Sequence, residues 1–181
     1  VDFNGQASLQ KACQGVDIVV HNAGITRAKS DAEYFEVNTY ATERLAKAAI
    51  QAKVTRFIFI SSLEARGPDG FKTAISSYGK SKLEAEHLLS NLQHKIEMIL
   101  LRPAGVYGPR DTDLLSLFQI AKYGFLTVPA TNSKLQPIHG RDVAEAVLAS
   151  IRNKTKLGPF EIAEANTYSW QDMTSMLELA M

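Results

Sequence analysis

Short apolar runs alternate with longer amphipathic stretches through the first part of the chain. The runs are "VDIVVHNAG" (16–24), "RFIFISS" (56–62) and "IEMILLRPAG" (96–105). Each is apolar almost throughout rather than at every second position, which is typical of strands that helices cover on both faces. The pattern therefore predicts three strands of a parallel sheet.

Two stretches with helical spacing of apolar residues separate these runs. The first, residues 30–53, begins with Ser30 and Glu33, a pair that is typical of a capping box at a helix start. The second, residues 76–93, carries leucines at helical spacing. The alternation predicts an α/β fold, with both helices serving as the crossovers of right-handed βαβ units.

The pattern is less regular after residue 105, which indicates a different subregion rather than a separate domain. There the sequence predicts a turn, a helix, a turn between two extended pieces, a helix, a strand and a last helix. These lie at 108–113, 114–124, 128–138, 141–153, 159–163 and from Ser169 onward. We divide the chain into residues 1–108 and a mixed region, 109–181, interleaved with the same sheet.

Composition excludes several classes of protein. Of the 181 residues, 45% are hydrophobic and 22% are charged, and the formal net charge is +1, so we expect neither nucleic acid nor a membrane as a partner. Cys13 is the only cysteine, which excludes an internal disulfide and disfavours a zinc site. No apolar run reaches the roughly 20 residues of a membrane helix. We predict a cytoplasmic protein, and the lack of an initiating Met suggests a chain that begins inside a longer one.

The stretch "SYGKSK" (77–82) carries the clearest candidate chemistry. Tyr78 and Lys82 are four residues apart and so share one face of a helix. An ammonium group beside a phenol lowers the pKa of the phenol, and such a tyrosine exchanges protons with an alcohol or a carbonyl during hydride transfer. The lysine is also a donor for a cofactor ribose. The alternative is a pair of ordinary residues on a helix surface.

Context favours the catalytic interpretation. Ser61 and Ser62 end an apolar strand, and doubly wound sheets bind ligands outside the carboxyl ends of their strands. A hydroxyl there can reach both a substrate oxygen and the phenol of Tyr78. Without the Tyr/Lys helix, the two serines would be interpreted as a simple strand end.

Six motifs in order resemble the extended short-chain dehydrogenases/reductases, the NAD-dependent epimerase/dehydratase superfamily. They are "VDIVVHNAG", "VN" (37–38), "RFIFISS", "YGKSK", "LRPAGVYGPRD" and "IHGRDVAEAV". The resemblance covers nearly the whole chain. It implies a partial Rossmann-like doubly wound parallel sheet over 1–108, which is an incomplete NAD(P)-binding domain, and a small C-terminal substrate-binding subregion over 109–181.

The resemblance also implies roles for individual residues. Tyr78 matches the catalytic acid/base, Lys82 the lysine that lowers its pKa and binds ribose, and Ser62 the serine that positions the substrate oxygen. The remaining matches are expected to contact an NAD or NADP cofactor, with NAD favoured. They are Asp2 and Phe3 at the adenine, Asn22, Ala23 and Gly24 at the phosphates and ribose, Asn38, and Pro103, Ala104, Gly105 and Val106 beneath the nicotinamide.

The sequence departs from the family pattern in ways that affect the cofactor and the substrate. No Gly-x-x-Gly-x-x-Gly turn occurs, so we expect residues of the parent to be missing before Val1. The chain ends at Met181 inside a predicted helix, so we expect residues to be missing there as well. Arg66 and Gly105 stand where the family often has an aromatic residue and an asparagine. The segment between Ser62 and Tyr78 is compact, which disfavours a sugar-nucleotide substrate.

Several polar residues remain open to two interpretations. Arg66 and Arg110 are candidate contacts for an anionic substrate, or ordinary surface arginines. Asn38 is an ordering residue of the site or a solvent-facing helix residue. We favour structural roles for His139 and for Asp142, which stands at a helix start.

Together the residues predict an NAD(P)-dependent oxidoreductase of the epimerase/dehydratase type, acting at a secondary alcohol or ketone carbon of a small molecule. A nucleotide-sugar epimerase is one form of this activity. The alternative is a non-catalytic dinucleotide-binding or scaffold protein of the same fold. In either case the resemblance implies a homodimer through the helices at 30–53 and 76–93.

Overall fold

A parallel sheet is the centre of the protein in its computed structural model, which describes residues 2–67, 73–111, 134–153 and 158–180. The strands β1 (Ile18–His21), β2 (Arg56–Ile60), β3 (Glu97–Pro103) and β6 (Phe160–Ile162) lie in that order, and each pair is parallel. The structure thus confirms the α/β class and the strands at 16–24, 56–62, 96–105 and 159–163, each with narrower bounds.

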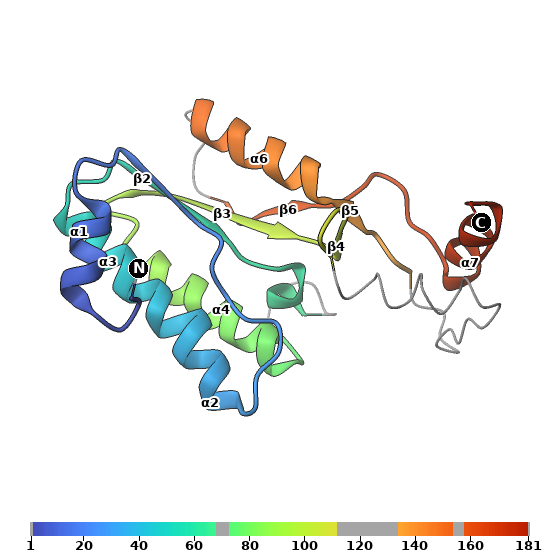
Figure 1. Ribbon diagram of the computed structural model, residues 1–181, viewed down its shortest axis with the longest axis horizontal. Coiled ribbons are helices and arrows are strands. Elements are labelled where there is room, and N and C mark those ends of the chain that lie inside the picture. The colour runs from blue at the N-terminus through green and yellow to red at the C-terminus, as the bar shows by residue number, and fades with distance from the viewer. Residues whose placement is uncertain (1, 68–72, 112–133, 154–157, 181) are drawn as a thin grey trace.

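Helices cover both faces of this sheet (Figure 1). The helices α1 (Gln6–Cys13), α3 (Ala41–Gln51) and α4 (Ser77–Ser90) lie on one side, and α6 (Gly140–Arg152) lies on the other. Alternate residues of the strands supply the two cores, as the pleat requires. Phe57 and Phe59 pack toward α1, α3 and α4, whereas Ile58 and Ile60 pack toward α6. All five residues of β2 are buried, which explains its unbroken apolar sequence.

The predicted helix at 30–53 consists of three segments. A short helix, α2 (Asp31–Tyr34), begins at Ser30, whose hydroxyl accepts a hydrogen bond from the Glu33 amide at 3.3 Å as the capping pattern predicted. A π-helical segment, η1 (Phe35–Tyr40), follows and leads into α3. Since π-helical turns are frequent at functional sites, η1 is a candidate part of such a site.

The second predicted crossover, at 76–93, is confirmed as α4. Ser76 caps it by accepting a hydrogen bond from the Gly79 amide at 2.9 Å. A short 3₁₀ helix, η2 (Leu63–Arg66), follows β2 and packs against the start of α4. The contact is so close that a Cβ at Gly79 would stand 2.5 Å from the Glu64 carbonyl oxygen.

The later part of the chain returns to the sheet. The strands β4 (Val106–Tyr107) and β5 (Ile138–His139) form a separate parallel pair, and the last helix, α7 (Trp170–Ala180), begins beside Ser169 as predicted. The predicted turn is seen at 108–111, where the Asp111 amide donates to the Gly108 carbonyl. The predicted helix at 114–124 lies outside the described residues, as does most of 128–138.

The helix α1 was not predicted from the sequence, because it has no side-chain cap at Gly5 and buries only Leu9 and Cys13. The region 109–181 is interleaved with the sheet in that β6 pairs with β3 and α6 covers one face. The boundary at 108 itself stays a prediction.

We expect Gly79→Ala to destabilise the fold, although alanine favours an isolated helix by about 1 kcal/mol. The added methyl group would press on the Glu64 backbone, which belongs to a packed turn, and overpacking of this kind costs about 1–3 kcal/mol. Urea unfolding should show a lower midpoint with an unchanged slope. Gly105→Ala is the matched control, because nothing lies within 4 Å of its added Cβ. Equal midpoints for the two variants would contradict the close contact.

Candidate active site

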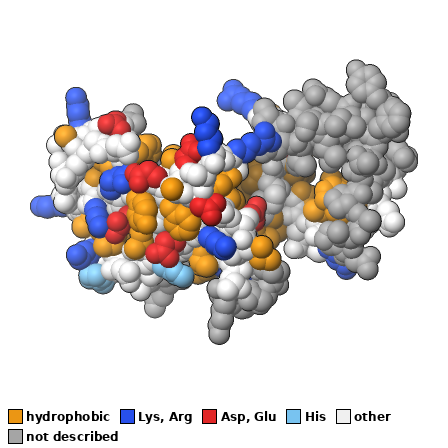
Figure 2. Space-filling view, turned by 90° about the horizontal axis from the view of Figure 1, so that it is seen from below, with side chains coloured by type: hydrophobic (Ala, Val, Ile, Leu, Met, Phe, Trp, Pro, Cys, Tyr) orange, Lys and Arg blue, Asp and Glu red, His pale blue; other side chains and the backbone are white. Residues whose placement is uncertain are grey.

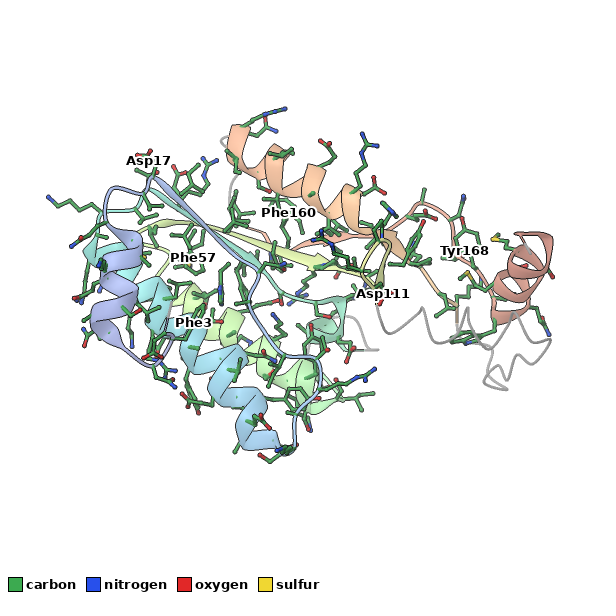
Figure 3. The ribbon with its side chains drawn as sticks, in the orientation of Figure 1. Phe3, Asp17, Phe57, Asp111, Phe160 and Tyr168 are labelled. Carbon is green, nitrogen blue, oxygen red and sulfur yellow. The ribbon has the colours of Figure 1, made fainter. Side chains whose placement is uncertain are left out.

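A cleft of about 920 Å³ opens at the carboxyl ends of β2 and β3. In a parallel sheet this edge is where ligands bind, because loops and helix N-termini converge there. The start of α4 forms one wall and the segment after β3 another. The cleft is lined by Ser61, Ser62, Tyr78, Pro103, Ala104, Gly105 and Val106, together with Thr26, Tyr34, Leu63, Glu64, Ser76, Ser77 and Asp111. Figure 3 labels Asp111 near β4, at this end of the sheet.

Tyr78 and Ser62 meet in this cleft. Their side chains are hydrogen-bonded, and Tyr34 packs edge-on against the Tyr78 ring at 6.2 Å between centroids. Ser62 also begins η2 and accepts a hydrogen bond from the Glu64 amide at 3.2 Å. The structure therefore brings together the serine and the tyrosine that the sequence paired, and both hydroxyl groups line one open space.

Lys82 lies one helical turn below Tyr78 and is buried. Its ammonium group donates to the Ile60 carbonyl at 3.0 Å and lies 4.8 Å from the centre of the Phe59 ring. Burial lowers the pKa of Lys82 to about 8, against an opposing effect of the Glu86 carboxylate. Near neutral pH the lysine is thus charged but close to its titration.

The pKa of Tyr78 differs from the sequence-based expectation. We expected Lys82 to lower it, but burial of the phenol raises it, while the hydrogen bond with Ser62 acts in the opposite direction and Glu64 and Tyr34 raise it further. The physical reason is that the Lys82 ammonium is directed at the Ile60 carbonyl and the removal of water dominates at the phenol. Tyr78 holds its proton at neutral pH in this structure.

Asn38 organises the loop that follows β1. It is fully buried, its side-chain oxygen accepts from the Ile25 amide at 2.8 Å, and its side-chain nitrogen donates to the Ile25 carbonyl and to the Ser81 hydroxyl, both at 3.0 Å. Of the two interpretations of Asn38, the structure excludes the solvent-facing one. The residue joins the π-helical segment to the loop and to α4.

Gly24 lies between Asn38 and Lys82. A Cβ at Gly24 would stand 3.0 Å from the Asn38 side-chain oxygen and 3.2 Å from the Lys82 nitrogen. The Gly24 backbone therefore lies close to the buried Lys82 ammonium group. An ammonium donor beside a backbone without a side chain can bind the hydroxyl groups of a ribose. Tyr78, Lys82 and the backbone of Pro103–Val106 are the residues that could hold the nicotinamide end of a dinucleotide.

The other predicted cofactor residues lie before α1 and directly after β1. Phe3 (Figure 3) packs against the core on the side of the sheet that α1, α3 and α4 cover. Its ring lies 5.8 Å from that of His21. Asp2 accepts from the Asn4 amide, and Asn22 and Ala23 are exposed at the carboxyl end of β1. None of these four lines the cleft with Tyr78. Their cofactor roles remain predictions.

The two candidate substrate arginines lie outside the cleft with Tyr78. Arg66 forms an ion pair with Glu161 of β6 at 2.8 Å. Arg110 has a positive φ of 75° and lines a neighbouring hollow of about 590 Å³ with His139 and Arg141. That hollow shares Val106 and Asp111 with the cleft, so Arg110 is the better placed of the two arginines.

The structural roles expected for His139 and Asp142 are consistent with the structure. His139 caps α6 by accepting a hydrogen bond from the Arg141 amide at 3.2 Å, and its ring packs edge-on against Tyr107 at 5.2 Å. Asp142 lies in the first turn of α6, where the helix dipole favours an acidic residue.

Sequence reasoning missed a buried charge cluster behind the cleft. Glu86 of α4 accepts two hydrogen bonds from Arg102 of β3, at 2.6 and 3.0 Å, and a third from the Ser61 hydroxyl. The available signal was Glu86 itself, which stands four residues after Lys82 and therefore on the inward face of the helix. A charged residue on that face requires a buried partner, but its spacing does not reveal which one.

His21 is a second buried titratable group that the sequence analysis did not select. Its Nε2 lies 2.8 Å from the Thr42 hydroxyl oxygen, and that hydroxyl donates its only proton to the Asn38 carbonyl at 2.7 Å. The ring nitrogen must therefore be the donor to Thr42. Burial, and secondarily the Lys82 charge, lower the pKa of His21 to about 4, so the ring is neutral at physiological pH.

Other kinds of site find no support in the part of the chain that the structure describes. No group of three or more His, Cys, Asp or Glu side chains there is arranged to hold a metal ion. Within the same residues, no helix combines the length and the apolar character needed to cross a bilayer.

A Rossmann-like parallel sheet with a Ser/Tyr/Lys cluster at its carboxyl edge defines the class of this protein. The family model described as the NAD dependent epimerase/dehydratase family matches residues 1–163. The chain belongs to that family, as the motif order predicted.

Individual relatives agree with this assignment. The chain is 30% identical over 175 residues to a ceramide reductase of Caulobacter vibrioides, covering 95% of this chain and 52% of the relative. It is also 30% identical over 203 residues to the UDP-glucose 4-epimerase of Vibrio cholerae, covering 99% and 62%. The structure superposes on UDP-glucuronic acid 4-epimerase from Bacillus cereus in complex with NAD with a TM-score of 0.88 and 26% identity, covering 99% and 64%. The chain thus spans about half to two thirds of the length of these relatives.

The neutral state of His21 should make folding stability depend on pH. Its pKa falls from 6.5 in the unfolded chain to about 4 in the fold, so the unfolded state binds more protons between these values. The contribution of His21 is complete above pH 6.5 and is lost as the pH falls toward 4, by up to about 3 kcal/mol. We expect His21→Gln to remove this part of the slope, measured by urea unfolding at several pH values.

The matched control for this prediction is His87→Gln, because the side chain of His87 is 63% exposed. Because His21 is retained in this variant, it should still lose stability as the pH falls from 6.5 toward 4. A His21→Gln slope that equals the wild type between pH 4 and 6.5 would refute the buried neutral state.

Proposed function

We propose that this chain carries the catalytic part of an NAD-dependent oxidoreductase of the epimerase type. The observation that carries the proposal is the meeting of Ser62 and Tyr78 in one cleft, one helical turn above a buried Lys82. Family membership adds the cofactor class. When bound, NAD would supply or accept the hydride, and the residues of this chain would handle the proton and the alignment.

Ser62 and Tyr78 would act directly on the substrate oxygen. In oxidation, Tyr78 would first release its phenol proton to solvent through the open cleft; the substrate hydroxyl proton then passes to the phenolate while the hydride leaves the same carbon, and a ketone results. In reduction, Tyr78 returns the proton to the carbonyl oxygen as the hydride is added. Because burial keeps Tyr78 protonated, the structure favours its role as the acid, with the Ser62 hydroxyl aligning the same oxygen.

Lys82 would contribute its charge and its remaining donors. One ammonium hydrogen bond goes to the Ile60 carbonyl, which fixes the side chain, and the group lies beside Gly24. A ribose above Gly24 would be within reach of such a donor. The same positive charge, about one helical turn from the phenol, would stabilise negative charge that develops on Tyr78 during proton transfer.

Two forms of the reaction have specific support. Epimerisation of a nucleotide sugar is supported by the likeness to UDP-glucose 4-epimerase and UDP-glucuronic acid 4-epimerase. Reduction without return of the hydride is supported by the likeness to ceramide reductase. We give epimerisation of a nucleotide sugar precedence because the superposition extends over 99% of this chain, although the compact segment after Ser62 argued against such a substrate.

The non-catalytic alternative is disfavoured by the site. A scaffold protein has no need to keep a phenol, a serine and a buried ammonium group together, since burying a charge costs free energy. The predicted homodimer through 30–53 and 76–93 remains a proposal. Figure 2 shows the face of the molecule on the side of these helices, where several hydrophobic side chains lie among charged ones. Tyr40 of η1, which belongs to the first of the two segments, is 46% exposed.

Tyr78→Phe should abolish turnover while NAD binding persists. Loss of a general acid/base lowers kcat by about 10²- to 10⁴-fold, whereas the phenyl ring keeps the packing against Tyr34. The measurement is kcat together with the dissociation constant for NADH, by fluorescence, in the full-length protein. Tyr40→Phe, at an exposed tyrosine, is the matched control and should retain wild-type kcat. Turnover by Tyr78→Phe at the control rate would exclude this mechanism.

A stoichiometry measurement separates the two forms of the reaction. An epimerase regenerates its cofactor in each cycle, so a UDP-sugar should convert to its C4 epimer, followed by NMR, with no net change in NADH absorbance. A reductase should consume one NADH for each ketone reduced. Consumption of NADH in step with product, and no epimer, would replace the first form by the second.

A further inference from the structure

Glu86 stands on the catalytic face of α4. It follows Lys82 by one helical turn and Tyr78 by two, so the three side chains form one stripe toward the sheet. Only 5% of Glu86 is exposed. The mechanism above gives it no role, although a buried carboxylate so close to a proton-transfer site is costly to keep without one.

The carboxylate of Glu86 connects three elements. One oxygen accepts from the Ser61 hydroxyl at the end of β2 and from Arg102 Nε at 3.0 Å. The other oxygen accepts from Arg102 Nη2 at 2.6 Å. Arg102 lies on β3 and is itself 7% exposed, so this is a buried, two-pronged ion pair between the helix and the strand.

The residues that Glu86 holds are neighbours of the site residues. Ser61 immediately precedes Ser62, and Arg102 immediately precedes Pro103, where the cleft wall begins. The Ser61 amide also donates to the Leu101 carbonyl at 2.7 Å, which ties the two strand ends together. A displacement of either strand end relative to α4 would therefore move Ser62 relative to Tyr78.

Glu86 also interacts with the two buried positive charges near the site, those of Lys82 and Arg102. Glu86, on the same helix, is the charged group that acts on Lys82, and it also binds Arg102 of β3, while Lys82 in turn acts on His21 of β1. His21 is neutral and Arg102 is cationic. Glu161 of β6 approaches Arg102 at 3.9 Å but is 36% exposed in its side chain and is shared with Arg66. Glu86 is thus the buried carboxylate that offsets the positive charges of both Lys82 and Arg102.

We propose that Glu86 is a positioning residue of the reaction: its carboxylate fixes Ser61 and Arg102, and with them the Ser62 and Pro103 segments, against the helix that carries Tyr78 and Lys82. The proposal rests on the proposed function for its kinetic part. Glu86 does not touch the substrate oxygen in this role. It sets the distance between the serine and the tyrosine and keeps Lys82 charged.

The effect on Lys82 gives a test that needs neither cofactor nor substrate. Burial lowers the pKa of Lys82 to about 8 and Glu86 opposes that shift, so the neutral Glu86→Gln should lower it further. The titration is followed at the Lys82 side-chain carbon beside the nitrogen by NMR of lysine-labelled full-length protein, with Lys82→Arg to assign the signal.

The matched control is Glu97→Gln, at the other end of β3. Glu97 also pairs with a buried arginine, Arg56, at 2.8 Å, but it lies far from Lys82 on the strand. This variant should leave the titration of Lys82 unchanged, and Glu86→Asp, which keeps the charge, should stay closer to wild type than Glu86→Gln. An unchanged titration in Glu86→Gln would overturn the electrostatic part of the proposal.

Ser61→Ala tests the positioning part without removing a buried charge. It deletes one hydrogen bond to Glu86, and we expect kcat to fall about 10-fold with KM changed less than about twofold, while the Lys82 titration stays as in wild type. Kinetics equal to wild type would overturn the positioning role. If wild type itself shows no NAD-dependent turnover, the proposed function fails, whereas the titration result for Glu86 still stands or falls on its own.

Discussion

The burial of a polar helix face against a parallel sheet is the constraint on which this structure depends. The inward side of α4 carries Ser81, Lys82 and Glu86, all at most 5% exposed, where an ordinary crossover helix would present apolar side chains. Buried polar groups cost several kcal/mol when unpaired, so the helix can pack only where each finds a partner. Among the described residues no buried side-chain nitrogen or oxygen is left without one.

Those partners come from η1, β2 and β3, and they fix the helix in place. Ser81 accepts from Asn38 of the π-helical segment, Lys82 donates to the end of β2, and Glu86 binds Arg102 of β3. Rotation or sliding of α4 would break several of these bonds at once. The same bonds fix the positions of the cleft residues, because Tyr78 lies on the first turn of this helix and Ser62 directly follows the strand end that Glu86 binds.

Much of the fold could be predicted because it depends on local patterns. The unbroken apolar runs identified the strands, and the Ser30 capping pattern marked a helix start that the structure confirms. The leucine spacing identified the helix α4. The helix α1 was missed because it lacks a cap and buries little. The π-helical turn was missed because it depends on Asn38 and Thr39, whose side chains bond to residues 13 and 42 positions away. Those contacts do not change the spacing of apolar residues along the sequence, from which the helix was predicted.

The sequence by itself determined the order of the elements and the residues that could do chemistry. The spacing of Tyr78 and Lys82 ensured a shared helix face, and Ser62 at a strand end ensured a place at the sheet edge. Only the tertiary structure decided where the Lys82 ammonium points, in which direction the pKa of Tyr78 shifts, and that Arg66 pairs with Glu161. These properties depend on burial and on partners from distant parts of the chain, and desolvation and hydrogen bonding are fixed only when those parts pack together.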